Sequence, residues 1–261
     1  MLTNRSTRVT FSIIGRCERT GAFGAAITTS DLAVGARCVR LAHGKGAMLS
    51  QHRTDSRLGD LGISLLAAGK RADETVSEVC NSTNDIEWRQ VGALDATGQA
   101  SVYHGRRMYS IFTHSIDKDC LALGNILAND QVTRKMADAF TANSDLPLGE
   151  RLMRALEAGR DAGGEIQGPL RSAGVRVTGE HGIDAMDLRV DMSEQTAIED
   201  LRKLVDAYAD RAENLREVAL APDGIPIKRG LFEASIQRIE ELGLQDRFPT
   251  ARNRDNWTLR D

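Results

Sequence analysis

TFSIIGR at residues 10–16 and AFGAAITTS at residues 22–30 are the segments from which the fold can first be predicted. Both are runs of apolar, β-branched and small residues, and a polar turn that ends in Gly21 separates them. Such runs on either side of a glycine-containing turn predict a β-hairpin. LAVGARCVRL at residues 32–41 and KGAMLSQ at residues 45–51 repeat the pattern, so we expect a second pair of strands.

Beyond this region, the spacing of the apolar residues alternates between helical and strand-like periods. We predict, in order, two helices within residues 57–82, two strands within residues 88–105, helices at about 130–142 and 148–161, strands at 172–177 and 185–190, and helices at 195–218 and 231–242. Strands and helices that come in pairs predict an α+β fold and not alternating βαβ units. Because the apolar strands need cover on both faces, we expect two antiparallel sheets packed face to face, with helices outside.

The composition excludes several classes of protein. The chain has 261 residues with a net charge of −3, so the charge balance does not favour nucleic acid as a partner. No apolar run approaches the ~20 residues of a membrane span, and the polar N-terminal segment is not a secretory signal. The four cysteines contain no CxxC pair, and the five histidines form no HExxH motif, so we expect no metal site. Free thiols favour the cytoplasm.

Several sequence blocks, in their order along the chain, resemble those of a known protein family. The blocks are TFSIIGR, SDLAVGARC, GKGAMLSQ, LGISLLAAG, RQVGALDATGQ, GNILAN and LEAGRDAGGE, spread over about residues 10–208. As a set they resemble domain-of-unknown-function family 1028 (DUF1028), which is placed among the N-terminal-nucleophile (Ntn) hydrolases. The resemblance implies a four-layer αββα sandwich over residues 10–208 and a nucleophile at the mature N-terminus, but it does not supply a substrate. Residues 209–261 are then a helical C-terminal tail.

Thr10 is the nucleophile that the resemblance implies. A threonine hydroxyl needs a base at neutral pH, and the α-amine of the same residue, with a pKa near ~8, has the right strength if it is free. Residues 1–9 precede Thr10, so we expect them to be disordered or absent from the native protein. A GTG codon at Val9 can start translation, and removal of the initiator methionine would then expose Thr10. From the residue alone, Thr10 also fits a β-branched strand starter.

Five further residues are candidates for the site. Asn125 is a polar amide in the apolar run LGNIL, which suits either an oxyanion donor or a structural bridge to backbone. Arg37 interrupts the predicted strand AVGARCV and would bind a substrate carboxylate or face an edge. The remaining candidates for substrate binding lie at the ends of predicted strands, namely Ser30, Gln51 and Asp55.

These observations predict a hydrolase of a carbon–nitrogen bond in a small amide, ureido or cyclic amide compound, with no cofactor. The alternative is a non-catalytic binding or scaffold protein that retains the Ntn fold, and a threonine peptidase ranks lower. The apolar stripe of the predicted 195–218 helix must pack on the domain's own sheets or on a second subunit. We expect a homodimer, because symmetric dimers are the commonest oligomers.

Overall fold

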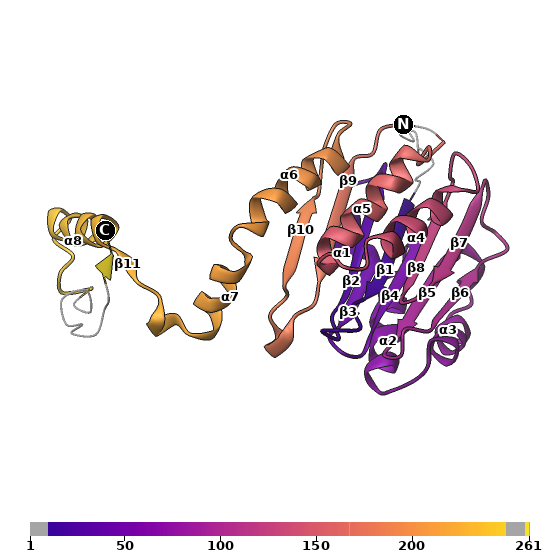
Figure 1. The fold of residues 1–261 in the computed structure, drawn as a ribbon, viewed down its shortest axis with the longest axis horizontal. Coiled ribbons are helices and arrows are strands. Elements are labelled where there is room, and N and C mark those ends of the chain that lie inside the picture. Colours follow the sequence, from indigo (N-terminus) through magenta and orange to yellow (C-terminus); the bar gives the residue numbers. More distant parts are fainter. Residues whose placement is uncertain (1–9, 167, 249–258, 261) are drawn as a thin grey trace. The chain divides into compact units, whose positions relative to one another are not determined.

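The computed structural model of the chain describes residues 10–166, 168–248 and 259–260 (Figure 1). The predicted N-terminal extension, residues 1–9, lies outside the described residues. The chain divides into two compact units, Met1–Ala209 and Asp210–Asp261. All candidate site residues belong to the first unit, so the fold of that unit determines how they meet.

The first unit contains two antiparallel sheets. The large sheet has the order β10-β9-β2-β1-β8-β7, formed by β1 (Thr10–Arg16), β2 (Phe23–Thr29), β7 (Phe112–Asp117), β8 (Cys120–Asn125), β9 (Ser172–Val177) and β10 (Met186–Val190). The small sheet has the order β3-β4-β5-β6, formed by β3 (Val39–Ala42), β4 (Gly46–His52), β5 (Arg89–Asp95) and β6 (Ala100–His104). All neighbours pair antiparallel. The predicted mixed α+β fold with antiparallel sheets is confirmed.

Helices cover the two sheets, and the helices of this unit are α1 (Val34–Cys38), α2 (Ser56–Ala67), α3 (Ala72–Asn81), the 3₁₀ turns η1 (Ile86–Trp88) and η2 (Glu180–Gly182), α4 (Val132–Ala142), α5 (Leu148–Asp161) and α6 (Ala197–Ala209). The pair α2 and α3 packs on β4, β5 and β6, whereas α4 and α5 pack on β1, β2 and β8 (Figure 1). Gly15 allows β1 and α4 to approach closely, since a Cβ at this position would lie 2.5 Å from the Phe140 ring of α4.

Three buried apolar clusters fill the spaces that this packing creates. Phe11 and Ile13 of β1 belong to the cluster under α4 and α5. Ile14 belongs to a second cluster that also contains Leu49 of β4 and Leu121 of β8, and therefore lies between the two sheets. Because side chains alternate along a strand, β1 presents one face to the helices and the other to the small sheet.

The second unit contains α7 (Ala212–Leu220), η3 (Pro222–Gly224), β11 (Ile227–Lys228), α8 (Arg229–Glu241) and β12 (Leu259–Arg260), with β11 and β12 parallel. The single helix expected over residues 195–218 is wrong, because α6 ends at Ala209 and α7 begins at Ala212. The stripe residues Ile198, Leu201 and Val205 are buried where α6 packs on β9 and β10 of its own sheet. Within the described ranges, no helix combines the length and apolar character that a bilayer span requires.

In the first unit, one local prediction is also wrong and one hairpin was not predicted. Residues 32–41 do not form one strand, because Val34–Cys38 is the short helix α1 and only β3 follows as a strand. Ala33 enters α1 in the left-handed region, with φ 51°, and the Val34 amide donates to the Ser172 hydroxyl at 3.2 Å. The hairpin of β7 and β8 was not predicted, and its turn uses Asp119 at φ 58° without any glycine.

Candidate active site

Thr10 begins β1, which has a neighbour on each side in the large sheet (Figure 1). In register it lies opposite Thr29, the last residue of β2, and Asn125, the last residue of β8. The Thr10 hydroxyl donates to Oγ1 of Thr29 at 3.2 Å, and Thr10 as a whole is 7% exposed. Three polar residues from three adjacent strands therefore meet at one end of the large sheet.

The side chain of Thr10 faces the space between the two sheets. Ser12 and Ile14 share its face of β1, because side chains alternate along a strand, and Ile14 lies in the cluster between the sheets. Phe11 and Ile13 point the other way, into the cluster under α4 and α5. The Thr10 hydroxyl is therefore shielded from the helices by its own strand.

A chain of buried side-chain hydrogen bonds joins the two sheets beside Thr10. The Ser12 hydroxyl donates to Oε1 of Gln51 at 2.7 Å, and Nε2 of Gln51 donates to Oε1 of Gln90 at 2.5 Å. Nδ2 of Asn125 donates to the same Gln90 oxygen at 3.0 Å. All four side chains have no exposed area, so these bonds form in a medium that strengthens them.

The orientation of the Asn125 amide follows from its partners. Gln90 must present its oxygen to Asn125, because its Nε2 donates to the Gly124 carbonyl at 2.9 Å. Asn125 then directs its nitrogen at Gln90, and its Oδ1 is buried without a hydrogen-bond partner among the described residues. A buried acceptor of this kind costs free energy unless something donates to it. Its position across from Thr10 makes it a candidate contact for an amine or a substrate N–H.

A pair of histidines extends the network to the outer strands β6 and β7. Nε2 of Gln90 also lies 3.0 Å from Nδ1 of His104, and Nε2 of His104 lies 2.9 Å from Nδ1 of His114. Burial, aided by the charge of His114, lowers the pKa of His104 to about 4, and burial also lowers the pKa of His114. Both rings are therefore neutral at pH 7, with the His104 proton on Nε2.

Glu165 lies at the same end of the large sheet. Its backbone forms an antiparallel bridge with Leu127, two residues beyond Asn125, and its side chain interacts with Ser30, directly after Thr29. These contacts lie on the two flanks of β1, which places Glu165 near the start of that strand. Burial raises the pKa of Glu165 to about 8, and a hydrogen bond with Ser30 offsets this only in part. A carboxyl of this kind is protonated at neutral pH and can donate a hydrogen bond.

Of the residues predicted from the sequence, Thr10, Gln51 and Asn125 meet in one buried cluster, and Ser30 lies at its edge. Gln51 has a different environment from the one expected, because both ends of its amide are bonded to protein groups and not left for substrate.

Arg37 and Asp55 do not join this network through any bond in the described part of the chain. Arg37 lies on α1 and not on an apolar strand, and its Nη2 donates to Asp31 at 3.2 Å and to the Leu32 carbonyl at 2.9 Å. Asp55 caps α2, since it accepts from the Arg57 amide at 3.1 Å and from the Arg57 guanidinium at 2.8 and 3.0 Å. A helix cap and a local ion pair account for these two side chains.

Six members of the site were not found from the sequence, namely Ser12, Thr29, Gln90, His104, His114 and Glu165. A signal for Gln90 exists, because it is a polar residue directly before the apolar run VGAL of the predicted strand. The two histidines lie on short strands of mixed polarity, one of which was not predicted. Glu165 follows two glycines with positive φ, Gly163 and Gly164, which suggests a turn and not a functional carboxyl.

The cysteines do not compete with Thr10 as nucleophiles in the network. All four are free thiols. Burial raises the pKa of Cys38, of Cys80 to about 11 and of Cys120 to about 12, which keeps these three protonated. The pKa of Cys17 is instead lowered, because hydrogen bonds with Thr20 and Arg19 outweigh its burial, but Cys17 follows β1 at the end away from Thr10. Among the described residues, no group of three His, Cys, Asp or Glu side chains is arranged to hold a metal ion.

The chain is a mixed α+β protein, with two antiparallel sheets, helices on their outer faces and a buried polar cluster between the sheets. Residues 10–201 match the model of DUF1028, a family of unknown function, and the chain belongs to that family.

The crystal structure of a family member agrees with this assignment. The chain is similar to the crystal structure of a DUF1028 protein from Silicibacter pomeroyi, with a TM-score of 0.71 and 29% identity over 77% of this chain and 86% of that chain. A weaker similarity, with a TM-score of 0.36 and 12% identity, links 77% of the chain to 97% of Anbu, an ancestral β-subunit from Yersinia bercovieri. No curated protein matches the sequence.

Proposed function

We propose that the protein is an N-terminal-nucleophile hydrolase in which Thr10 cleaves a carbon–nitrogen bond of a small amide, ureido or cyclic amide compound. The observation that carries the proposal is the position of Thr10, at the start of an interior strand, with its hydroxyl between the sheets beside a buried polar network. The family match also begins at residue 10. The packing of helices, two sheets and helices supports a sandwich of the αββα type.

The chemistry requires that the α-amine of Thr10 be free. Oγ1 of Thr10 attacks the substrate carbonyl carbon while the amine accepts the hydroxyl proton, and the carbon–nitrogen bond breaks as the amine returns that proton to the leaving nitrogen. Water, deprotonated by the same amine, then hydrolyses the ester on Oγ1 and regenerates the hydroxyl. The protein supplies the base and the nucleophile from one residue, so no cofactor is needed.

Groups around Thr10 have supporting roles in this proposal. The Thr29 hydroxyl, 3.2 Å from Oγ1, fixes the rotamer of the nucleophile. Nδ2 of Asn125 has a second N–H, beyond the one given to Gln90, that can stabilise the oxyanion together with a backbone amide. Oδ1 of Asn125 gains the partner it lacks when the Thr10 amine or a substrate N–H donates to it.

Glu165 completes the proposed site as a positioning residue. A neutral carboxyl near the start of β1 can hydrogen-bond the Thr10 amine without protonating it permanently, which leaves the amine able to act as a base. Ionisation of Glu165 at higher pH would favour the charged ammonium form of the amine. The raised pKa of Glu165 therefore sets an upper limit near pH 8 for the active arrangement.

The proposal is tested with the chain prepared so that Thr10 is its first residue. It is screened for turnover of linear amides, ureides and lactams beside Thr10→Ala, Thr10→Ser and a control, Thr113→Ala, in the edge strand β7. We expect Thr10→Ala to lose about 10³-fold or more of kcat, Thr10→Ser to keep part of it, and the control to match the wild type. Turnover by Thr10→Ala at the wild-type rate would refute the mechanism.

A non-catalytic binding or scaffold role is the alternative, and the low exposure of Thr10, 7%, favours it. A buried hydrogen-bond network can hold two sheets together without performing chemistry. The same screen separates the two proposals, since a binding protein shows no turnover with any residue at position 10.

We also propose that the protein is a cytoplasmic homodimer. Packing of α6 on its own sheet buries most of the apolar stripe that motivated the dimer but leaves Leu204 41% exposed. Leu215, Val218 and Leu220 of α7 are 48%, 42% and 43% exposed and are candidates for a subunit contact. Light scattering at micromolar concentration should give twice the chain mass, and a monomer mass would count against the dimer.

A further inference from the structure

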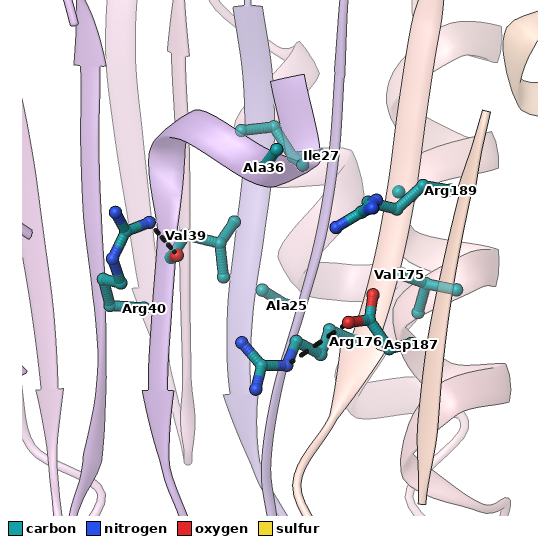
Figure 2. A pocket seen from close by; sticks show the side chains of 11 residues that line it. Ala25, Ile27, Ala36, Val39, Arg40, Val175, Arg176, Asp187 and Arg189 are labelled. Atoms are coloured by element: carbon teal, nitrogen blue, oxygen red, sulfur yellow. Dashed lines mark hydrogen bonds and ion pairs between the residues drawn. The ribbon is translucent and has the colours of Figure 1, made fainter. Parts of the chain in front are cut away.

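A hollow of about 170 Å³ lies on the large sheet apart from the Thr10 cluster (Figure 2). It is lined by residues of β2, α1, β3, β9 and β10. The large sheet has two strands beyond β2, whereas the small sheet ends at β3, which packs on β2. The face of β9 and β10 that turns toward the small sheet therefore extends past its edge, and α1 covers part of β9 there.

The two guanidinium groups of β9 and β10 supply the hollow with hydrogen-bond donors. Arg176 and Arg189 point from their strands toward the side of α1 and β3 (Figure 2). Nε of Arg176 pairs with Asp184 at 2.8 Å and lies 3.9 Å from Asp187, and Nε of Arg189 lies 3.6 Å from Asp191. Within the described residues, the Nη groups of both arginines donate no hydrogen bond, so their paired donors face the hollow.

The other charged groups in and around the lining determine its net charge. Arg40 is engaged elsewhere, since it donates to Asp60 and, at 2.9 Å, to the Val39 carbonyl. Asp187 is the one carboxylate that lines the hollow. Asp184 and Asp191, outside the lining, pair with Arg176 and Arg189 through Nε, so the hollow has no excess of positive charge. An anion would therefore be held by directed hydrogen bonds from the Nη groups, which suits a monoanion better than a dianion.

The floor of the hollow is apolar. Ala25 and Ile27 of β2 and Val39 of β3 belong to the cluster between the sheets and are buried. Gly174 keeps this floor close to Arg189, because a Cβ there would lie 3.4 Å from the arginine Cγ. A ligand that fits must therefore combine one anionic group with a short hydrocarbon part.

We propose that this hollow binds a small aliphatic monocarboxylate. The Nη groups of Arg176 and Arg189 would hold the carboxylate, since the planar guanidinium matches the two oxygens of that group. The hydrocarbon chain would lie on Ala25, Ile27 and Val39. This site is separate from the Thr10 chemistry and does not depend on it.

Titration calorimetry of the full chain with butyrate tests the site. We expect saturable binding with a Kd on the order of 1 mM, as befits a ligand of few atoms. Arg189→Gln should weaken binding about tenfold or more, because a charge-assisted hydrogen bond is lost. Ala36→Trp should abolish it by filling the hollow, and since Ala36 is exposed this variant keeps the core and every charge. The matched control is Arg154→Gln, on α5.

Two results would overturn the proposal. One is the absence of saturable heat with butyrate, or the same Kd in all variants, which would mean that the carboxylate does not occupy this hollow. The other is tighter binding of inorganic phosphate than of butyrate by the wild type, with the phosphate affinity sensitive to Arg189→Gln, which would assign the hollow to a different anion.

Discussion

The space between the two sheets has two ends with opposite chemistry. At one end, Ile14, Leu49 and Leu121 pack in a dry apolar cluster. At the other end of the same strands, Thr10 and the Ser12–Gln51–Gln90–Asn125 network bury polar groups. Burying amides and hydroxyls stabilises a fold much less than burying methyl groups does, even when every group is bonded. The polar end is therefore the part of this space on which the proposed function rests.

The largest effect on stability is expected at the apolar end. Leu121→Ala should lower the free energy of unfolding by about 2–5 kcal/mol, because Leu121 is fully buried and its removal leaves a cavity. Any activity per folded molecule should be unchanged. Denaturant unfolding beside an activity assay checks both, and a loss of activity without a loss of stability would contradict the division of roles.

At the polar end, the expected effect falls on activity. Asn125→Ala should lower kcat about 10²-fold through loss of an oxyanion donor, with a smaller change in stability than Leu121→Ala. Substitution of the exposed Asn84 by alanine is the control and should leave kcat unchanged. A folded Asn125→Ala variant with wild-type kcat would remove Asn125 from the site.

A smaller, pH-dependent effect is expected at Glu165. Its folded-state pKa of about 8 lies above its ordinary value of 4.5, so the folded protein holds a proton that the unfolded chain releases between these values. Stability contributed by this group is therefore full below about pH 4.5 and is lost as the pH rises toward 8. Glu165→Gln should remove this loss, which we expect to be on the order of 2 kcal/mol after allowance for partial solvent exposure.

Thermal unfolding of the wild type and Glu165→Gln at pH 5 and pH 8 measures this difference. Relative to the wild type, Glu165→Gln should unfold at a higher temperature only at pH 8. Glu180→Gln, at an exposed position, should unfold at the same temperature as the wild type at both pH values. Parallel pH profiles for wild type and Glu165→Gln would contradict the buried neutral carboxyl.

The parts of the fold that sequence patterns predict are those fixed by local periodicity. The β1–β2 hairpin, β4, the β5–β6 hairpin and the pairs α2–α3 and α4–α5 follow from runs of apolar residues and their spacing. The short helix α1 at residues 34–38 was not predicted, because VGARC has the composition of a strand. Its helical form is supported by the bond from Val34 to Ser172, a residue 138 positions away in the chain.

The same dependence on local sequence explains which residues of the site could be predicted. Thr10, Gln51 and Asn125 were reached through resemblance. Thr10 begins β1, Asn125 ends β8, and Gln51 lies one residue before the end of β4. Gln90 bonds to Gln51 and Asn125 across 39 and 35 positions, and only the pairing of strands brings them together. The raised pKa of Glu165 depends on burial at a sheet end, which no local pattern encodes. Arg37 and Asp55 were chosen for their charge, and nearby partners satisfy it.

The mass of the mature protein tests the central claim most directly, because Thr10 can act as nucleophile and base only with a free amine. Protein purified from native cells is measured intact, and its N-terminal peptide is labelled at the α-amine before digestion. We expect the main species to begin at Thr10 and to carry the label there. Recovery of a catalytically active species in which Val9 remains joined to Thr10 would contradict the claim.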